Sequence, residues 1–194
     1  MDAHVFVDNS NIFKGARRAS QALEPEVDRV AVRLCYRNFF ELIEHGYRPQ
    51  TRVLAGSVPP GNDDIWQYAR DCGYRTDLLR RVDLMDGNQR EQGVDEILHL
   101  KIAHALLDFD PPQTLVIATG DAATSEFGTS FREKVTRALR RGWNVCIWSW
   151  REQIGRAFVQ QMEHARGAMT IRYLNDYYNE ITFVTGGRVV ECLR

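Results

Sequence analysis

The sequence predicts a single α/β domain built on a parallel β-sheet with helices on both faces. Short apolar runs alternate along the chain with longer segments in which apolar residues recur at helical spacing. The 194 residues, 44% of them hydrophobic, are enough to bury a full core. No repeat, linker or low-complexity tract divides the chain. Alternating strands and helices are typical of parallel sheets that helices cover on both sides.

The predicted strands are short apolar runs that end at polar or turn-forming residues. The first run, residues 4–8, ends at Asp8, and the run at residues 114–118 leads directly to Asp121. The other main strands are expected at residues 52–55, 74–79 and 143–150, with short β-rich pieces at residues 170–173 and 180–184. We therefore expect a domain over residues 1–168 and a β-rich extension over residues 169–194 that packs on it.

The predicted helices combine apolar periodicity with recognisable first and last residues. Asp63 and Asp64 suit the positive end of a helix dipole, Gly73 ends that helix, and Pro111 ends a later one. Helices are expected at residues 12–21, between Asp28 and Gly46, and at residues 62–73, 94–109, 129–141 and 151–165. The polar segment 80–93 is predicted to be a mobile loop.

Composition limits the partners and the kinds of site that the chain can have. The 25 basic and 26 acidic side chains nearly balance, so the chain has no global basic field to attract nucleic acid. Most of the basic residues are arginines, which suit phosphates and carboxylates. The four cysteines form no CxxC pair, which favours reduced thiols over a zinc site. No signal peptide or membrane-spanning run is present, so we expect no membrane partner and a cytoplasmic location, with a nuclear one left open.

Three carboxylates are predicted to meet at one edge of the sheet. Asp8 and Asp121 follow apolar strands, and Asp95 begins a helix that leads back from the same edge. Such a cluster repels itself unless a cation neutralises it, and oxygen ligands suit Mg²⁺ or Mn²⁺. A structural explanation stays open for single acids, since Asp95 suits a first helical turn and Asp8 can accept hydrogen bonds from backbone N–H groups.

The segments 5–11, 93–95 and 117–121 together resemble the motif series of the NYN domain family, within the PIN-like nuclease superfamily. The most specific part is Asp-Asn-Ser-Asn after an apolar strand, at residues 8–11. The resemblance spans residues 5–150 and implies a Rossmann-like, PIN-like fold. It also implies a ribonuclease that hydrolyses phosphodiester bonds with a Mg²⁺- or Mn²⁺-activated water. The catalytic and metal-binding residues would then be Asp8, Asp95 and Asp121.

The sequence departs from this pattern at Ala123, where many PIN-like proteins have a second acid. Glu126 could replace that acid as a metal ligand, and Ser125 could contact substrate, although Glu126 also suits a first helical turn. The alternative function is therefore a catalytically weakened NYN-type module that binds RNA or scaffolds proteins. An aspartyl phosphatase with Asp8 as nucleophile is disfavoured because Ser10 stands where a second acid would serve the leaving group.

The resemblance also implies RNA as the partner, and single-stranded RNA is expected. The substrate-binding candidates all lie in or just after the first strand-to-helix turn: Asn9, Asn11, Lys14, Arg17 and Arg18. For the basic residues among them, a solvated helix face is the alternative explanation. Trp148 is predicted to pack in the core and Trp150 either to pack there or to stack on a base. Tyr177 and Tyr178 could pack on the core or support a homodimer.

Overall fold

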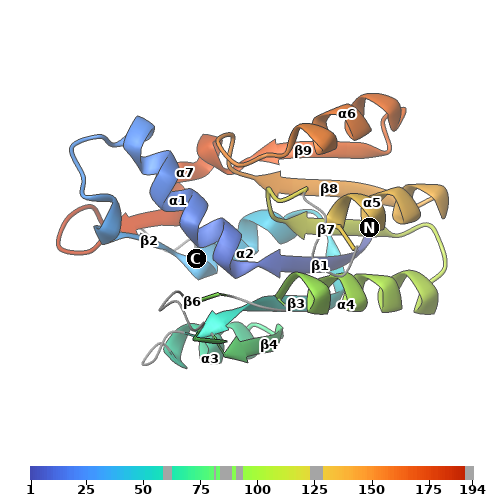
Figure 1. The fold of residues 1–194 in the computed structure, drawn as a ribbon, viewed down its shortest axis with the longest axis horizontal. Coiled ribbons are helices and arrows are strands. Elements are labelled where there is room, and N and C mark those ends of the chain that lie inside the picture. Colours follow the sequence, from blue (N-terminus) through green and yellow to red (C-terminus); the bar gives the residue numbers. More distant parts are fainter. Residues whose placement is uncertain (59–62, 81, 84–88, 91–93, 123–128, 191–194) are drawn as a thin grey trace.

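The computed structural model describes residues 1–58, 63–80, 82–83, 89–90, 94–122 and 129–190. These residues form one α/β domain around a six-stranded parallel sheet, as the sequence predicts (Figure 1). The sheet strands, in chain order, are β1 (Asp2–Asp8), β3 (Arg48–Val58), β4 (Arg75–Arg80), β7 (Thr114–Ala118), β8 (Asn144–Ser149) and β9 (Met169–Tyr173). Their order across the sheet is β4-β3-β1-β7-β8-β9.

This strand order places a topological switch point between β1 and β7. Numbered along the chain, the six strands lie in the order 3-2-1-4-5-6, which is the order of a Rossmann-like sheet. The chain leaves β1 toward β3 on one side and returns to β7 on the other side. Ligands of such sheets bind in the crevice outside the carboxyl ends of the two strands at the switch point.

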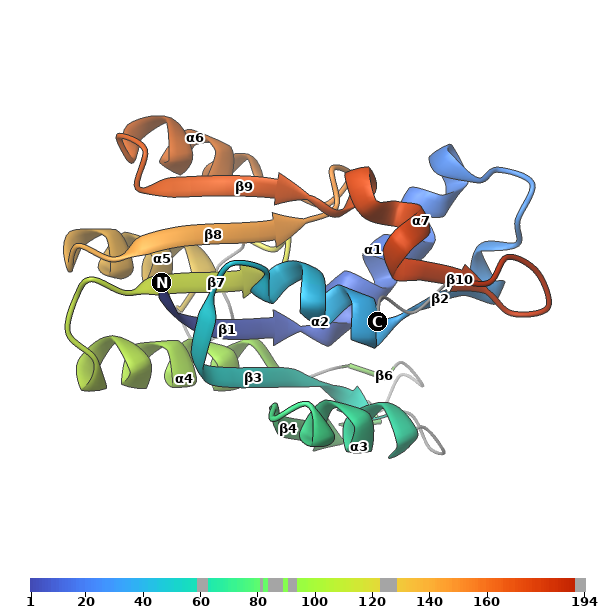
Figure 2. The same cartoon turned by 180° about the vertical axis from the view of Figure 1, so that it is seen from behind.

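Helices cover both faces of the sheet because the side chains of each strand alternate between two apolar layers. In β1, Val5 faces one hydrophobic cluster and Phe6 the other. The first cluster is shared with α1 (Asn9–Leu23), α2 (Tyr36–Glu44) and α3 (Asp63–Asp71). The second is shared with α4 (Val94–Asp108), α5 (Phe131–Arg140) and α6 (Arg156–His164). Figures 1 and 2 show the two helical layers from opposite sides.

The segment after Asp28 differs from the helix that its sequence predicts. Residues Arg29–Ala31 form a short 3-10 turn, η1, and Val32–Leu34 form the strand β2 before α2 begins at Tyr36. Strand β2 pairs antiparallel with β10 (Thr182–Val184) from the C-terminal part of the chain. The strand is therefore stabilised by a partner about 150 residues away, which local periodicity cannot reveal.

The C-terminal part of the chain contributes a strand to the main sheet, in addition to packing on the domain as the predicted extension would. Residue 169, where we expected an extension to begin, is the first residue of β9, which pairs with β8 at the edge of the main sheet. The 3-10 helix η2 (Leu174–Tyr177) and the helix α7 (Tyr178–Ile181) lead from β9 to β10. Tyr178 is buried and the ring of Tyr177 contacts Trp148, so both tyrosines pack on the core.

Two smaller features complete the described fold. The polar segment 80–93, predicted to be a loop, contains a short antiparallel pair formed by β5 (Val82–Asp83) and β6 (Gln89–Arg90), and its remaining residues 81, 84–88 and 91–93 lie outside the described part. Cys35, Cys72 and Cys146 are all free thiols. Within the described residues, no helix has the length and apolar character needed to cross a membrane.

Candidate functional site at the carboxyl ends of β1 and β7

Asp8 is the last residue of β1 and the N-cap of α1. Its backbone is extended, and its Oδ1 atom accepts a hydrogen bond from the backbone N–H of Asn11 at 3.0 Å. This is the usual role of an aspartate at a helix N-terminus, where the first N–H groups lack helical partners. Only 5% of the residue's surface is exposed. The strand therefore holds a nearly buried carboxylate at the switch point.

Thr119 joins Asp8 to the segment that follows β7. Its buried hydroxyl donates to Asp8 Oδ2 at 3.3 Å and accepts from the backbone N–H of Asp121 at 3.2 Å. A second link lies beside it, because Asn11 Oδ1 accepts a hydrogen bond from the backbone N–H of Gly120 at 2.9 Å. These contacts bring Asp8, Asn11 and the backbone of Asp121 together at the carboxyl ends of the two strands.

Close packing around Gly120 fixes the position of this segment. A Cβ atom at residue 120 would lie 2.6 Å from the backbone oxygen of Gln153 and 2.7 Å from Ser149 Oγ. The carbonyl oxygen of Gly120 also accepts a hydrogen bond from the N–H of Gly155 at 2.9 Å. A side chain at this position would push the loop after β7 away from the loop after β8.

Trp150 contributes to the same packing and is unavailable for base stacking. The residue is fully buried, and its indole N–H donates to the backbone oxygen of Ile12 at 2.9 Å. This bond ties the end of β8 to the first turns of α1. Trp148 is buried as well. Core packing is thus the role of both tryptophans.

A depression of about 310 Å³ opens beside Asp121. Its lining includes Asn11 and Arg18 from α1 and Glu152 from the loop after β8. Arg18 is exposed, and Lys14 lies one helical turn before it, also exposed. Two of the predicted basic residues therefore extend along α1 from the edge that carries the carboxylates.

Glu152 is a site residue that the sequence prediction missed. Its two carboxylate oxygens accept hydrogen bonds from the Nδ2 group of Asn175 at 3.0 and 3.2 Å. Its position in the sequence could have indicated this role. Like Asp8 and Asp121, Glu152 comes soon after a parallel strand, and so it lies at the same edge of the sheet.

The structure gives Asn9 and Arg17 roles within the fold. Asn9 Oδ1 accepts a hydrogen bond from the hydroxyl of Tyr36, whose burial raises its pKa and keeps it protonated. The Arg17 guanidinium lies over the ring of Phe13 and donates to the backbone oxygen of Val30 at 3.1 Å. Arg17 thus connects α1 to the turn before β2 and lies apart from the depression.

The remaining predicted residues fall into two groups. Asp95 lies half-buried in the first turn of α4, the helix that begins at this edge of the sheet. Ser125 and Glu126 lie outside the described residues, as does Ala123.

His99 is a buried imidazole in the second turn of α4. Its Nδ1 atom is 2.8 Å from Thr129 Oγ1, and its ring contacts Phe131 edge-on. Burial, and secondly the positive charge of Lys134, lower the pKa of His99 to about 4, although Asp121 is among the acids that oppose this shift. The imidazole is therefore neutral at physiological pH.

The switch point has carboxylates but, within the described part of the chain, no complete set of metal ligands. Among the described residues, no group of three or more histidine, cysteine, aspartate or glutamate side chains is arranged to hold a metal, so the structure does not bring Asp8, Asp95 and Asp121 together as the three-carboxylate site that the sequence predicts. Mg²⁺ keeps several of its waters and binds through one or two carboxylates together with substrate phosphates. Thr119 links the Asp8 carboxylate to the backbone N–H of Asp121, which holds the backbone of these two acidic residues near each other.

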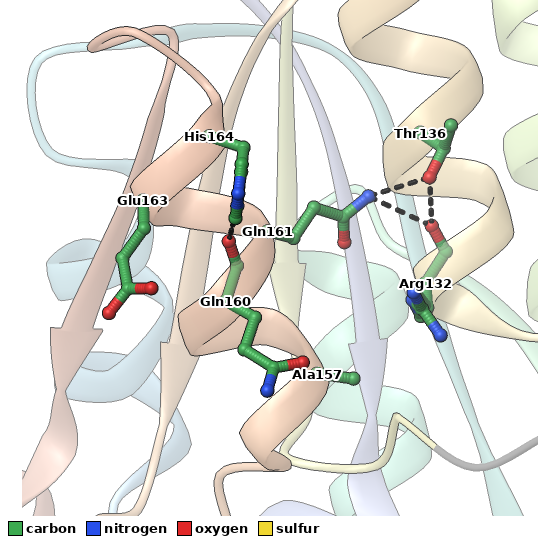
Figure 3. A pocket seen from close by; sticks show the side chains of 7 residues that line it. All are labelled: Arg132, Thr136, Ala157, Gln160, Gln161, Glu163 and His164. Carbon is green, nitrogen blue, oxygen red and sulfur yellow. Dashed lines mark hydrogen bonds between the residues drawn. The ribbon is translucent and has the colours of Figure 1, made fainter.

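A second hollow lies away from this edge, between α5 and α6. It has a volume of about 470 Å³ and contains none of the predicted site residues. Figure 3 shows Gln161 reaching from α6 to α5, where its amide donates to the Thr136 hydroxyl at 2.7 Å and to the Arg132 backbone oxygen at 3.2 Å. These bonds explain how the two helices are held together across the hollow.

Comparison with known proteins supports the fold. No protein-family model and no curated protein matches the chain. Among solved structures, the chain is similar to a protein of unknown function, VPA0982, from Vibrio parahaemolyticus RIMD 2210633. The TM-score is 0.64 and the sequence identity 13%, over 89% of this chain and 91% of that chain. The two proteins therefore share a fold, and the activity of this chain must be argued from its own residues.

Proposed function

We propose that this chain is a metal-dependent ribonuclease of the NYN type that hydrolyses phosphodiester bonds in single-stranded RNA. The observation that carries the proposal is the hydrogen-bonded link from Asp8 through Thr119 to Asp121, located where a Rossmann-like sheet binds its ligands. The resemblance of residues 8–11 and 117–121 to the NYN motifs supports the same activity.

Asp8 and Asp121 are the residues proposed to hold Mg²⁺ or Mn²⁺, with Asp95 as a third carboxylate and Glu126 as a further candidate. When bound, the ion would neutralise phosphate charge and lower the pKa of a coordinated water. Thr119 orients the Asp8 carboxylate, and Asn11 holds the segment that carries Asp121. These bonds fix the Asp8 carboxylate and the backbone that carries Asp121, which limits the reorganisation needed when substrate binds.

The basic residues of α1 are proposed to hold the RNA backbone. Arg18 borders the depression beside Asp121, and Lys14 lies one turn nearer the start of the helix. Since the net charge of the chain is −1, this attraction is local, and binding should weaken as salt increases. The buried thiols of Cys35 and Cys146 suit a reducing compartment, so we propose the cytoplasm as the place of action.

The test is cleavage of a fluorescently labelled single-stranded RNA by the purified chain with Mg²⁺, with Mn²⁺ or with EDTA. We expect cleavage with either ion and none in EDTA. The double variant Asp8→Asn with Asp121→Asn should lower the rate at least about 100-fold, because ligands matter at least as much as the groups that orient them. Asparagine also caps helices well, so α1 should remain folded, as circular dichroism can check.

The matched control is Asp110→Asn, which makes the same substitution once, on an exposed side chain just before β7, at the opposite end of that strand. It should cleave RNA at the rate of the unmodified chain. Cleavage that persists in EDTA or in the double variant would refute the proposal. Wild-type protein that binds RNA but does not cleave it with either ion would favour the alternative of a catalytically weakened module.

A further inference from the structure

A further polar cavity, distinct from the two hollows described above, lies at the other end of the sheet from Asp8. Its volume is about 490 Å³, within the range of small-ligand pockets. The walls come from the first half of β3, the turn that leads into β4 and the second half of α4. Asp8 pairs with Ala55 farther along β3, so this cavity is separate from the proposed catalytic edge.

Four basic side chains from these three segments line the cavity: Arg52, Arg75, Lys101 and His104. Arg75 is exposed and, among the described residues, has no ion-pair partner. The acid that lines the cavity with them is Asp108, near the end of α4. With Arg52 paired to Glu44 and His104 taken as neutral, the cations Arg75 and Lys101 stand against the acid Asp108, so the cavity carries a small excess of positive charge although the chain as a whole has a net charge of −1.

Arg52 is held so that one side of its guanidinium stays available to the cavity. Its Nε and Nη2 atoms donate to the two carboxylate oxygens of Glu44, at 2.9 and 3.0 Å. The Nη1 atom lies on the side of Gly73, 3.6 Å from the position that a Cβ atom would occupy there. Gly73 also lines the cavity. Glu44 thus fixes the arginine in place, while Nη1 is left as a donor for a ligand.

We propose that this cavity binds a phosphate ester that carries neighbouring hydroxyl groups, either a mononucleotide or the terminal nucleotide of an RNA strand. Guanidinium groups from Arg52 and Arg75, with the ammonium of Lys101, are the donors that phosphate oxygens prefer. The Asp108 carboxylate would accept hydrogen bonds from sugar hydroxyls, which favours a nucleotide over bare phosphate. The site does not depend on the proposed ribonuclease activity, because it uses none of the residues of the catalytic edge.

The test is isothermal titration of the full chain with AMP, with inorganic phosphate and with a short RNA bearing either a 5′-phosphate or a 5′-hydroxyl group. EDTA is present throughout, so that cleavage cannot consume the RNA. We expect AMP to bind more tightly than inorganic phosphate. The double variant Arg75→Gln with Lys101→Gln should weaken AMP binding at least about tenfold.

The matched control is Arg140→Gln, which removes an exposed charge at the end of α5, outside the cavity. It should leave AMP binding unchanged. If the 5′-phosphorylated RNA binds more tightly than the 5′-hydroxyl RNA, the ligand is an RNA end. If AMP binds but the two RNAs bind equally, the ligand is a free nucleotide. No binding of AMP or RNA at about 10 mM, or equal weakening by the double variant and by Arg140→Gln, would overturn the proposal.

Discussion

Replacing Thr119 with valine tests whether its hydroxyl holds the two strand ends together. The change conserves shape but removes the donor to Asp8 Oδ2 and the acceptor for the Asp121 N–H. A hydrogen bond to a charged group contributes about 1.5–3 kcal/mol and a neutral one about 1 kcal/mol, so we expect the free energy of unfolding to fall by about 2–4 kcal/mol. For a chain of this length, that corresponds to a fall in Tm of about 4–16 °C.

The assay is urea unfolding followed by circular dichroism, with Thr119→Ser as the control. Serine keeps the hydroxyl and loses one buried methyl group, at a cost of about 1 kcal/mol. At this fully buried position, hydrophobicity alone would make the valine variant more stable than the serine variant. The hydrogen bonds predict the opposite, a more stable serine variant. A valine variant as stable as the serine variant, or more stable, would refute the reasoning.

Two further predictions concern the surroundings of the site. Gly120→Ala should lower the free energy of unfolding by about 1–3 kcal/mol, because its Cβ would meet the Gln153 backbone oxygen at 2.6 Å; Gly187→Ala, where the nearest contact is 3.3 Å, should cost less in the same urea experiment. The free energy of unfolding should fall by on the order of 3 kcal/mol as pH falls from about 6.5 to 4, because His99 takes up a proton in the unfolded chain before it does so in the folded chain. The variant His99→Gln should flatten that part of the stability curve, and an NMR titration that gives His99 a pKa of 6.5 or more would contradict the assignment.

Most of the main sheet was predictable because its strands are buried on both faces. The run Thr114–Ala118 is almost wholly apolar, and the structure confirms it as β7 with the same limits. The predicted helix at residues 94–109 corresponds to α4, Val94–Asp108. In such segments the local pattern and the tertiary environment favour the same structure. Strand β2 was not predictable, since its partner β10 lies at the other end of the chain.

The candidate site was predictable in part for a related reason. Parallel strands end at one edge, so the sequence could place Asp8 and Asp121 at the same edge, and the pairing of β1 with β7 in the structure makes them neighbours. The role of Arg17 could not be predicted, because the backbone oxygen of Val30 that accepts its hydrogen bond is placed by tertiary folding. Glu152 follows β8 as Asp121 follows β7, but no motif beside it marks it in the sequence.

The sequence by itself determined the α/β class, the approximate positions of most strands of the main sheet and the placement of two acids after strand ends, because apolar periodicity and the alternation of strands with helices are local properties. The tertiary structure alone decided that β1 and β7 lie side by side, that Thr119 links Asp8 to Asp121, and that basic residues of β3, β4 and α4 line one cavity. These features depend on contacts between residues far apart in the chain. Such contacts are selected by packing of the whole core, which no local pattern records.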